Sequence, residues 1–444
     1  MTDQEQSTRP FSAMPTITFP NNYPEIMPEY LAELSLQHGP IMRRAVGQQF
    51  GNHQWMVYMV GPEANKFVMH THRNYFSHDL GWTPLLGGVF EKGLLNSDDP
   101  EHARDRKMMN PAFAIAYMNR YLPIMQQVIA TRTSDWAERG TVDIYQEMRK
   151  ITFDIAAEAL VGFQRGPDVD RLRDLFYRII VPDFNLAGSE EEYMVSFTEI
   201  QSQLNGMLLQ MIAERREHPT DDILGLLVQA RDENGAAFDD RQLLGQLHIL
   251  LVAGHETSTT LASWLLYLLA THPNYLLRVQ SEIDRTMQGQ DTLTLDLLRS
   301  MPQLNNALDE AARLYSPVGN VPRGVTQDVV FQGYTIPTGT FVMLSLAACH
   351  RLPSIFHSPA EFDPDRFAPP REEDKKVPYS LVPFGGGQRI CIGINFAQVE
   401  IKALAAHVLQ RFTLVPDANR VPQQAYYGPN ASMPNGMVLH VSDR

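Results

Sequence analysis

Cys391 follows a glycine-rich segment and precedes an amphipathic one, within the stretch Phe-Gly-Gly-Gly-Gln-Arg-Ile-Cys-Ile-Gly at residues 384–393. Glycines permit backbone turns that other residues resist, and they let a loop approach a flat cofactor closely. A helix N-terminus beside the sulfur is expected to lower the thiol pKa and favour the thiolate. A lone cysteine is usually a small core residue, but the spacing Phe-x-x-Gly-x-Arg-x-Cys-x-Gly is far more restrictive. We therefore predict that Cys391 is a cofactor ligand and that Cys349, which has no such context, is structural.

The segment Ala-Gly-His-Glu-Thr at residues 253–257 places an acid directly before an alcohol inside a long apolar stretch. Gly and Thr are poor helix-interior residues, so they suit a place where a buried helix opens a groove. An acid followed by an alcohol can relay protons. The His-Glu pair could also begin the zinc motif H-E-x-x-H, but the second histidine would fall at Thr259, which excludes that interpretation. A polar patch in a buried helix is the structural alternative.

Two further charged pairs have helical spacing. Glu310 and Arg313 are three residues apart, and Arg366 follows in the Pro- and Asp-rich stretch 362–367. His102 and Arg106 are four residues apart. Such pairs lie on one helix face and are usually solvated surface, so their weight comes only from their combination with the other segments.

Together these segments resemble the cytochrome P-450 superfamily, because the cysteine stretch is similar to its haem-binding signature and the others follow in the family's order. The resemblance implies that Cys391 binds the iron of haem b as the proximal thiolate, which favours O–O cleavage. It implies that Glu256 and Thr257 are the catalytic pair that delivers protons. Glu310, Arg313 and Arg366 would form a buried network holding the cysteine loop. The implied haem-binding residues are Cys391, His102, Arg106, Arg323, Arg389, Phe384, Gly385, Gly393, Ala253 and Gly254.

The resemblance also implies a reaction and a pocket. The protein would insert one oxygen atom of O₂ into an organic substrate, by hydroxylation or epoxidation, and release the other as water. The family's topology implies these pocket residues: Phe90, Leu95, Phe184, Ile249, Val252, Val318, Val321 and Met433. Because they are mostly apolar, we expect an apolar small-molecule substrate. The pairing of Ala-Gly-His-Glu-Thr with Phe-Gly-Gly-Gly is similar to retinoid- and sterol-oxidising branches.

Electrons are expected from a separate protein, because we find no flavin signature and two cysteines cannot ligate an iron–sulfur cluster that needs four. The donor would be of the ferredoxin or flavodoxin type, served by its reductase. A basic patch could dock it, although scattered surface charge is an equal alternative. The candidate residues are Arg104, Lys107, Arg366, Lys375, Lys376 and Lys402.

The elements that must position these residues are mainly helical. Predicted helices cover 62–70, 118–139, 145–161, 169–180, 190–218, 221–232, 274–288, 303–315 and a last stretch to about 410. The longest begins at Asp239-Asp240, ends before His272-Pro273 and must cross the centre of the molecule. Strands are predicted at 41–45 and 54–60, joined by a turn at Gly51-Asn52, and at 329–331 and 340–344, which we expect to pair with each other. The predicted fold class is mainly α with a small β part formed by both ends.

Composition bounds the alternatives. The chain has 444 residues, a formal net charge of −14 and two cysteines. The acidic balance argues against nucleic acid as a partner, and so few cysteines favour a reducing compartment. We see neither a signal peptide nor a membrane anchor. We expect a cytoplasmic monomer with a single domain over residues 1–444 and a short flexible N-terminus over about 1–20.

Other functions remain as rivals. A peroxygenase or isomerase could use the same haem, but those branches tend to lose the acid–alcohol pair. A haem sensor or carrier without turnover would not need that pair. Product formation with added redox partners separates the rivals.

Overall fold

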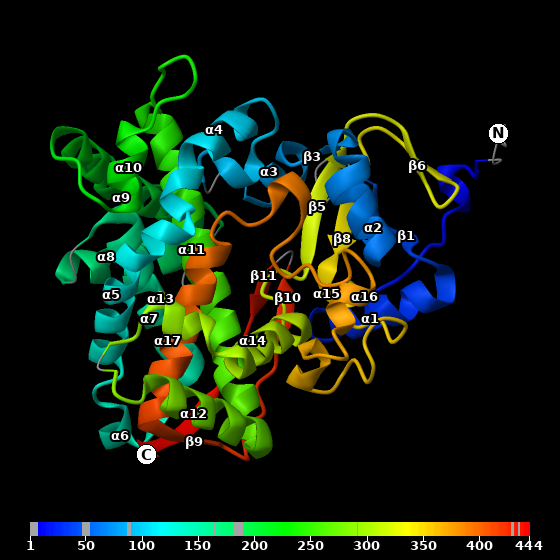
Figure 1. Ribbon diagram of the computed structural model, residues 1–444. Helices are drawn as coiled ribbons and strands as arrows, with labels where there is room; N and C mark the ends of the chain where they lie inside the picture. Colours follow the sequence, from blue (N-terminus) through cyan, green and yellow to red (C-terminus); the bar gives the residue numbers. More distant parts are fainter. Residues whose placement is uncertain are drawn as a thin grey trace.

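The computed structural model describes residues 8–46, 54–86, 90–163, 166–180, 190–290, 292–427, 430–433 and 436–444. Most of the helices gather in one body, and a five-stranded sheet with α1 (Tyr23–His38) and α2 (Pro62–Lys66) forms the other side of the molecule (Figure 1). The C-terminus lies at the far end of the helical body. The mainly α fold class with a small β part is therefore confirmed.

The helix α11 (Asp240–Thr271) runs through the helical body. Its 32 residues make it about 48 Å long. Asp239 caps its start, where Oδ1 accepts from the Gln242 N–H at 2.7 Å and the Gln242 side chain accepts from the Asp239 N–H at 3.0 Å. Pro273 follows its end because proline cannot continue the hydrogen-bond ladder. Both predicted ends of the long helix are confirmed.

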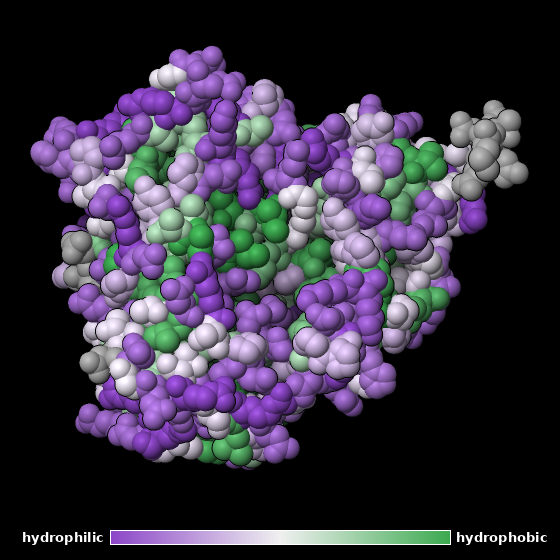
Figure 2. All heavy atoms as spheres, in the orientation of Figure 1, coloured by the Kyte–Doolittle hydropathy of each residue, from purple (hydrophilic) through white to green (hydrophobic). Residues whose placement is uncertain are grey.

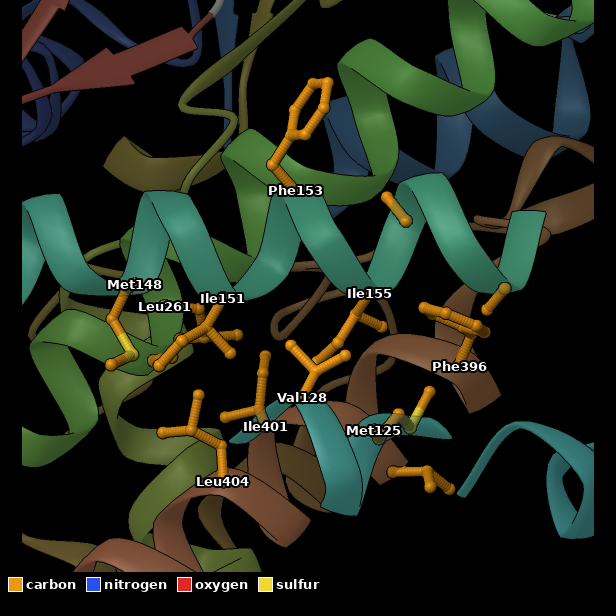
Figure 3. Packing of buried hydrophobic residues seen from close by; sticks show 14 of the residues in the cluster. Met125, Val128, Met148, Ile151, Phe153, Ile155, Leu261, Phe396, Ile401 and Leu404 are labelled. Carbon is orange, nitrogen blue, oxygen red and sulfur yellow. The ribbon is translucent and has the colours of Figure 1, made fainter. Parts of the chain in front are cut away.

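Three other helices pack around α11 to form the main apolar core: α5 (Ile115–Arg132), α7 (Ile144–Ala156) and α17 (Ile394–Arg411). Figure 3 shows Met148, Ile151 and Ile155 on one side of α7, directed toward α5 and α17. Phe153 points to the opposite side of α7. The helix α7 therefore separates the deep core from a second layer that includes α8 (Pro167–Ile180).

The remaining helices complete the body and its edges: α3 (Asp79–Leu86), α4 (Glu101–Met109), α6 (Trp136–Arg139), α9 (Glu190–Glu217), α10 (Ile223–Gln229), α12 (Pro273–Met287), α13 (Leu295–Arg299), α14 (Pro302–Leu314), α15 (Leu346–Cys349) and α16 (Glu373–Lys376). The predicted helix at 118–139 is in fact two, α5 and α6, separated by a turn at residues 133–135. No helix among the described residues is long and apolar enough to cross a membrane.

The main sheet has the strand order β1-β2-β8-β5-β3. Its strands are β1 (Ile41–Ala45), β2 (Trp55–Val60), β3 (Phe76–Ser77), β5 (Asn320–Val325) and β8 (Phe341–Ser345). The pair β1–β2 is antiparallel, as predicted, and its expected turn at Gly51-Asn52 lies outside the described residues. β2 and β8 are parallel, so the sheet joins the first quarter of the chain to the segment before the cysteine loop.

The predicted pairing of 329–331 with 340–344 is wrong. β6 (Val329–Phe331) pairs with β7 (Tyr334–Ile336), and β8 pairs with β2 and β5 instead. The reason is the turn at Gln332 and Gly333, whose φ angles are 51° and 78°. Two central residues with positive φ form a tight hairpin turn, so β6 pairs with the segment that follows it directly.

The other strands are β4 (Thr141–Asp143), β9 (Phe412–Pro416), β10 (Ala425–Tyr427), β11 (Asn430–Ser432) and β12 (Val438–Asp443). They form the sheets β4-β12-β9 and β10-β11. Part of the N-terminus also has a fixed place, although the sequence predicted a flexible segment. Met14 and Ile17 are buried, and Thr16 bridges to Arg43 of β1, because these apolar residues cover the sheet edge.

Candidate functional site

Cys391 is held by a tight loop that ends directly before α17. The Cys391 N–H donates to the Phe384 carbonyl at 2.9 Å and closes the loop. Gly385 and Gly387 have φ angles of 73° and 64°, which favour glycine. A Cβ on Gly387 would lie 2.4 Å from the Met69 carbonyl oxygen. The glycine-rich turn predicted from the sequence is therefore present, and its glycines are required both for backbone angle and for close packing.

The thiol of Cys391 is solvent-accessible, yet protein atoms enclose it. A side chain that faces an internal space rather than bulk water is both accessible to solvent and enclosed by protein. Burial raises the pKa of Cys391, and the Gly393 N–H and Arg106 lower it by less. The prediction of a net lowered pKa is therefore wrong for the free thiol, because lost hydration outweighs the helix N-terminus. A metal cation bound to the sulfur would reverse this balance and deprotonate the thiol.

The middle of α11 is its least buried part. Ala253 is exposed, and Gly254, Glu256 and Thr257 are half-buried, between fully buried runs at 243–251 and 258–266. Thr257 donates its hydroxyl proton to the Ala253 carbonyl at 2.6 Å, so the hydroxyl oxygen can still accept. On the face drawn in Figure 2, apolar side chains gather in a recess at the centre of the molecule. The helix thus presents small and polar groups to an accessible interior.

Basic side chains gather beside Cys391. Each acts electrostatically on at least one other member of the group, and Arg106 also acts on Cys391. The members come from four separate parts of the chain: His78, His102, Arg106, Arg323 and Arg389. Sequence reasoning missed His78, because neither its neighbours nor its spacing mark it. Only the tertiary structure brings it to the group.

Arg323 is the most isolated of these cations. It is 5% exposed, and its guanidinium donates to the Pro322 carbonyl at 2.7 Å. Burial and the neighbouring Arg389 lower the pKa of Arg323 to about 9. Among the described residues, no carboxylate lies within ion-pair distance of Arg323 or Arg106. A buried cation without a counter-ion is costly, so this group calls for additional negative charge.

The acidic side chains nearby are already engaged. Asp98 accepts from the Ser77 hydroxyl at 2.5 Å and the His78 N–H at 2.7 Å. Asp99 lies 3.4 Å from His102 Nδ1 and 3.7 Å from Arg389 Nη2. The two propionates of a haem would supply the missing negative charge. Burial lowers the pKa of His102 to about 4, and the propionates would raise this pKa because nearby negative charge favours the protonated ring. The residues present therefore fit the haem that the sequence implied.

Glu256 is held by two basic partners. Its Oε1 accepts from Arg149 Nε at 3.2 Å and Nη2 at 3.0 Å, and lies 3.1 Å from His255 Nε2. Burial alone would raise the pKa of Glu256, but His255 and Arg149 outweigh it and lower the pKa to about 2. The carboxylate is therefore ionised throughout the physiological range. Sequence reasoning missed Arg149, because it comes from α7, more than a hundred residues away.

The predicted Glu310–Arg313–Arg366 network is present, and all three side chains are 0% exposed. Glu310 accepts from Arg313 at 2.8 Å through each carboxylate oxygen and from Arg366 Nε at 3.0 Å. Arg366 also pairs with Glu373 at 2.8 Å. Arg313 further donates to the His350 and Pro359 carbonyls. The network therefore ties α14 to the irregular segment that leads to the cysteine loop.

The predicted docking patch does not form as a unit. Arg366 is fully buried in the network above, and Lys402 is 8% exposed. Arg104 and Lys107 pair with Asp232 and Glu233. Arg366 reaches inward to the buried Glu310, and Lys402 lies within electrostatic range of the Asp309 carboxylate. Lys375 and Lys376 remain exposed, and Lys375 pairs with Glu372.

The predicted pocket residues have mixed placements. Phe90 is half-buried, and its ring centroid lies 6.2 Å from that of Phe176 and 5.4 Å from that of His248. Ile249 and Met433 are buried at 7% and 4% exposure. The half-buried members of the set are Leu95, Val252, Val318 and Val321, and Phe184 lies outside the described residues.

Comparisons with known proteins find similar sequences over most of this chain. The cytochrome P-450 family model matches residues 17–439. A Synechocystis protein named putative cytochrome P-450 120 is 32% identical over 390 residues, which are 86% of this chain and 86% of that protein. The sterol 14alpha-demethylase of Mycolicibacterium vanbaalenii is 26% identical and covers 80% of this chain and 81% of its own.

Solved structures give the same result. The retinoic acid-bound cyanobacterial CYP120A1 superposes with a TM-score of 0.81 and 27% identity, over 97% of this chain and 99% of that one. The cytochrome P450DA heme domain superposes with a TM-score of 0.84 and 26% identity, over 98% of both chains. The architecture described above is shared by both of these solved structures.

Proposed function

The chain belongs to the cytochrome P-450 family of haem monooxygenases, and from this premise we propose that it inserts one oxygen atom of O₂ into an apolar organic substrate by hydroxylation or epoxidation. The observation that carries the proposal is Cys391 in its glycine-rich loop, beside the buried Arg323 and the half-buried Arg106, neither of which has a carboxylate at ion-pair distance among the described residues. A sulfur ligand and a propionate cradle together are the requirements of a haem-thiolate site.

The haem would be of the b type, because the chain has only Cys349 and Cys391 and therefore no C-x-x-C-H attachment motif. When bound, haem would supply the chemistry of O₂ activation, with electrons delivered by the redox partner. Cys391 would bind its iron. His102, Arg106, Arg323 and Arg389 would bind the propionates, with His78 as an added member of the cradle.

Glu256 and Thr257 would deliver protons during oxygen activation. The Thr257 hydroxyl oxygen can accept a hydrogen bond while the hydroxyl donates its own proton to the Ala253 carbonyl. Glu256 precedes it on α11 and has a half-buried carboxylate. Positioned proton transfer of this kind contributes about 10²–10⁴-fold to rate.

We propose an isoprenoid-like apolar substrate, with retinoids as the first class to test. The proposal is supported by the apolar character of the predicted pocket residues and by two relatives: one structure contains retinoic acid and one protein is named a sterol demethylase. Binding would appear as a spin-state shift of the haem absorption. Retinoic acid, a sterol and a fatty acid can be compared in one titration series.

The electron donor would be a ferredoxin- or flavodoxin-type protein with its reductase. Lys375 and Lys376 are two exposed members of the predicted patch and would contribute to docking it. A cytoplasmic location and action as a single-domain monomer belong to the same proposal, supported by two cysteines that are both free.

The first test is the absorption spectrum of the dithionite-reduced protein with and without carbon monoxide. We expect the strongly red-shifted Soret band of a thiolate-ligated complex, and we expect Cys391→Ala to abolish it. Cys349→Ala is the matched control, because Cys349 is buried away from the loop and its thiol faces the Ser380 carbonyl at 3.5 Å. A histidine-type band, or no bound haem, would refute the proposal.

A further inference from the structure

His255 is a fully buried side chain to which the proposed function gives no role. Its Nδ1 lies 2.5 Å from the Leu251 carbonyl oxygen, and its Nε2 lies 3.1 Å from Glu256 Oε1. A carbonyl only accepts, so Nδ1 must carry a proton. A hydrogen bond between Nε2 and Glu256 Oε1 then needs one more proton. This proton lies either on Nε2, which makes the ring a cation beside a carboxylate, or on Oε1, which leaves the ring and the carboxyl group neutral. The pair therefore shares one proton.

Aromatic rings surround this histidine. The ring centroids of Phe153, Phe176 and Tyr177 lie 5.2, 5.3 and 5.6 Å from that of His255. Aromatic rings attract cations through their negative faces, so the cage can favour the charged imidazole. Phe153 comes from the side of α7 that faces away from the deep core (Figure 3). Phe176 and Tyr177 both belong to α8.

Arg149 links the same cage to Glu256. Its guanidinium lies 3.9 Å from the centroid of the Tyr177 ring, and the Tyr177 hydroxyl donates to the Arg149 carbonyl at 3.1 Å. All three bonds from Arg149 and His255 go to Oε1 of Glu256. The Oε2 atom takes part in none of these three bonds, and Tyr145 forms a further hydrogen bond with the Glu256 carboxylate.

We propose that His255 is the immediate proton donor to Glu256 and that α8 sets which of the two side chains holds the shared proton. The inference rests on the proposed role of Glu256 in proton delivery. In the transfer, the Nε2–H bond breaks and an O–H bond forms on Glu256, while no electrons move. The ring and the carboxyl both become neutral. Without its charge, Glu256 is held less strongly by Arg149 and can turn toward Thr257.

The pair can regain its proton from solvent, because the Glu256 side chain is 21% exposed. The other titratable and charged groups around it are Arg149 and Tyr145 on α7 and Tyr177 on α8. Burial raises the pKa of both tyrosines, so they stay protonated. Arg173 of α8 acts on Tyr177 but is itself paired with Asp154 at 2.6 Å.

The main test compares His255→Gln with the wild type, both loaded with haem and supplied with redox partner and substrate. Glutamine can donate to Oε1 but has no transferable proton. We expect substrate binding to stay within about twofold and product formation to fall by about a hundredfold. Hydrogen peroxide release per electron pair should rise, and the solvent isotope effect should increase.

The matched control is His407→Gln on α17. His407 is half-buried and bonded to the Thr133 hydroxyl at 3.0 Å, away from Glu256. It should change neither the isotope effect nor hydrogen peroxide release. Glu256→Gln is the parallel arm. If Glu256→Gln is impaired and His255→Gln is not, the inference is overturned and the proposed function stands. If neither variant is impaired, the proposed role of Glu256 is wrong.

The role of α8 is tested by a comparison of Tyr177→Leu with Tyr177→Phe. Leucine removes the aromatic ring and should lower product formation and raise hydrogen peroxide release, whereas phenylalanine keeps the ring and should change both less. Equal effects of the two variants would overturn the control by α8. Neutron diffraction from the wild type needs no variant: deuterium is expected on Nδ1 and between Nε2 and Oε1. A contact without deuterium would overturn the shared proton.

Discussion

At the scale of single residues, the interior of this protein contains ionisable groups that lack their usual partners. Arg323 donates to a carbonyl instead of a carboxylate. Both carboxyl oxygens of Glu400 on α17 and the hydroxyl of Ser258 on α11 are buried and have no hydrogen bond of ordinary geometry among the described residues. Ser258 faces Glu400, and its hydroxyl lowers the pKa of Glu400 by less than burial raises it. Burial raises the pKa of Glu400 to about 8, because ionisation there would leave an unsolvated charge.

Glu400→Gln should therefore change how stability depends on pH. The folded-state pKa of about 8 lies above the unfolded value of 4.5, so between these values the unfolded state binds fewer protons than the folded state. Wild-type stability then falls as pH rises through the window, by up to about 1.4 kcal/mol per pH unit. Glutamine does not titrate, so the variant should gain stability relative to the wild type between about pH 5 and pH 8.

Urea denaturation at several pH values, followed by tryptophan fluorescence, measures this difference. A difference between the two proteins that stays constant with pH would contradict the raised pKa of Glu400. If the free energy of unfolding of the variant minus that of the wild type decreased as pH rises, the sign of the pKa shift would be contradicted.

At the scale of elements, the site depends on how α14 holds the irregular segment before the cysteine loop. Glu310 of α14 accepts from Arg313 on its own helix and from Arg366 at the far end of that segment. Arg366 continues the chain of contacts to Glu373 of α16. A loop without regular hydrogen bonds needs such fixed points, because its backbone alone does not define one conformation.

Glu310→Gln should destabilise the protein by about 3–5 kcal/mol, because two arginines that are 0% exposed would lose their shared carboxylate. Haem incorporation should fall with it. The unfolding midpoint and the ratio of Soret to protein absorbance report the two effects. The control is Asp296→Asn, which breaks the exposed pair with Arg299 and should cost no more than about 1 kcal/mol. Equal effects of both variants would argue against the role of the network.

At the scale of the whole molecule, the site lies where the helical body meets the sheet (Figure 1). Arg323 comes from β5 and His78 directly follows β3, whereas His102 and Arg106 come from α4. Cys391 precedes α17. A ligand bound by all of these elements stabilises their arrangement, because it binds the folded state and not the unfolded chain.

Removal of haem should therefore lower the unfolding temperature and loosen the parts that bind it. Hydrogen exchange measured by mass spectrometry should increase most in residues 76–78, 97–106, 320–325 and 384–393. The helices α12 and α13, which supply none of the cradle residues, should change least. At a haem concentration of 100 times its Kd, the expected stabilisation is about 2.7 kcal/mol. An even increase of exchange over the whole chain would contradict the proposed location of the haem.

Local chain signals made a large part of this protein predictable. The ends of α11 follow from an acidic N-cap residue and a proline, which act within one turn of the chain. The glycine turn around Gly385 and Gly387 is likewise a local backbone requirement. The Glu310 network was recognised by resemblance, not by spacing, because an i,i+3 pair alone does not distinguish a buried network from a solvated one.

The amino-acid sequence by itself determined the mainly helical fold, the long central helix and the cysteine loop, because each depends on residues close together in the chain. Tertiary structure alone decided which side chains are dehydrated and which charges meet. It raised the pKa of Cys391 where helix position predicted a fall, and it buried Arg366 and Lys402. It also enclosed His255 in aromatic rings and paired Glu256 with Arg149. Burial and through-space electrostatics depend on three-dimensional distance, which spacing along the chain does not give.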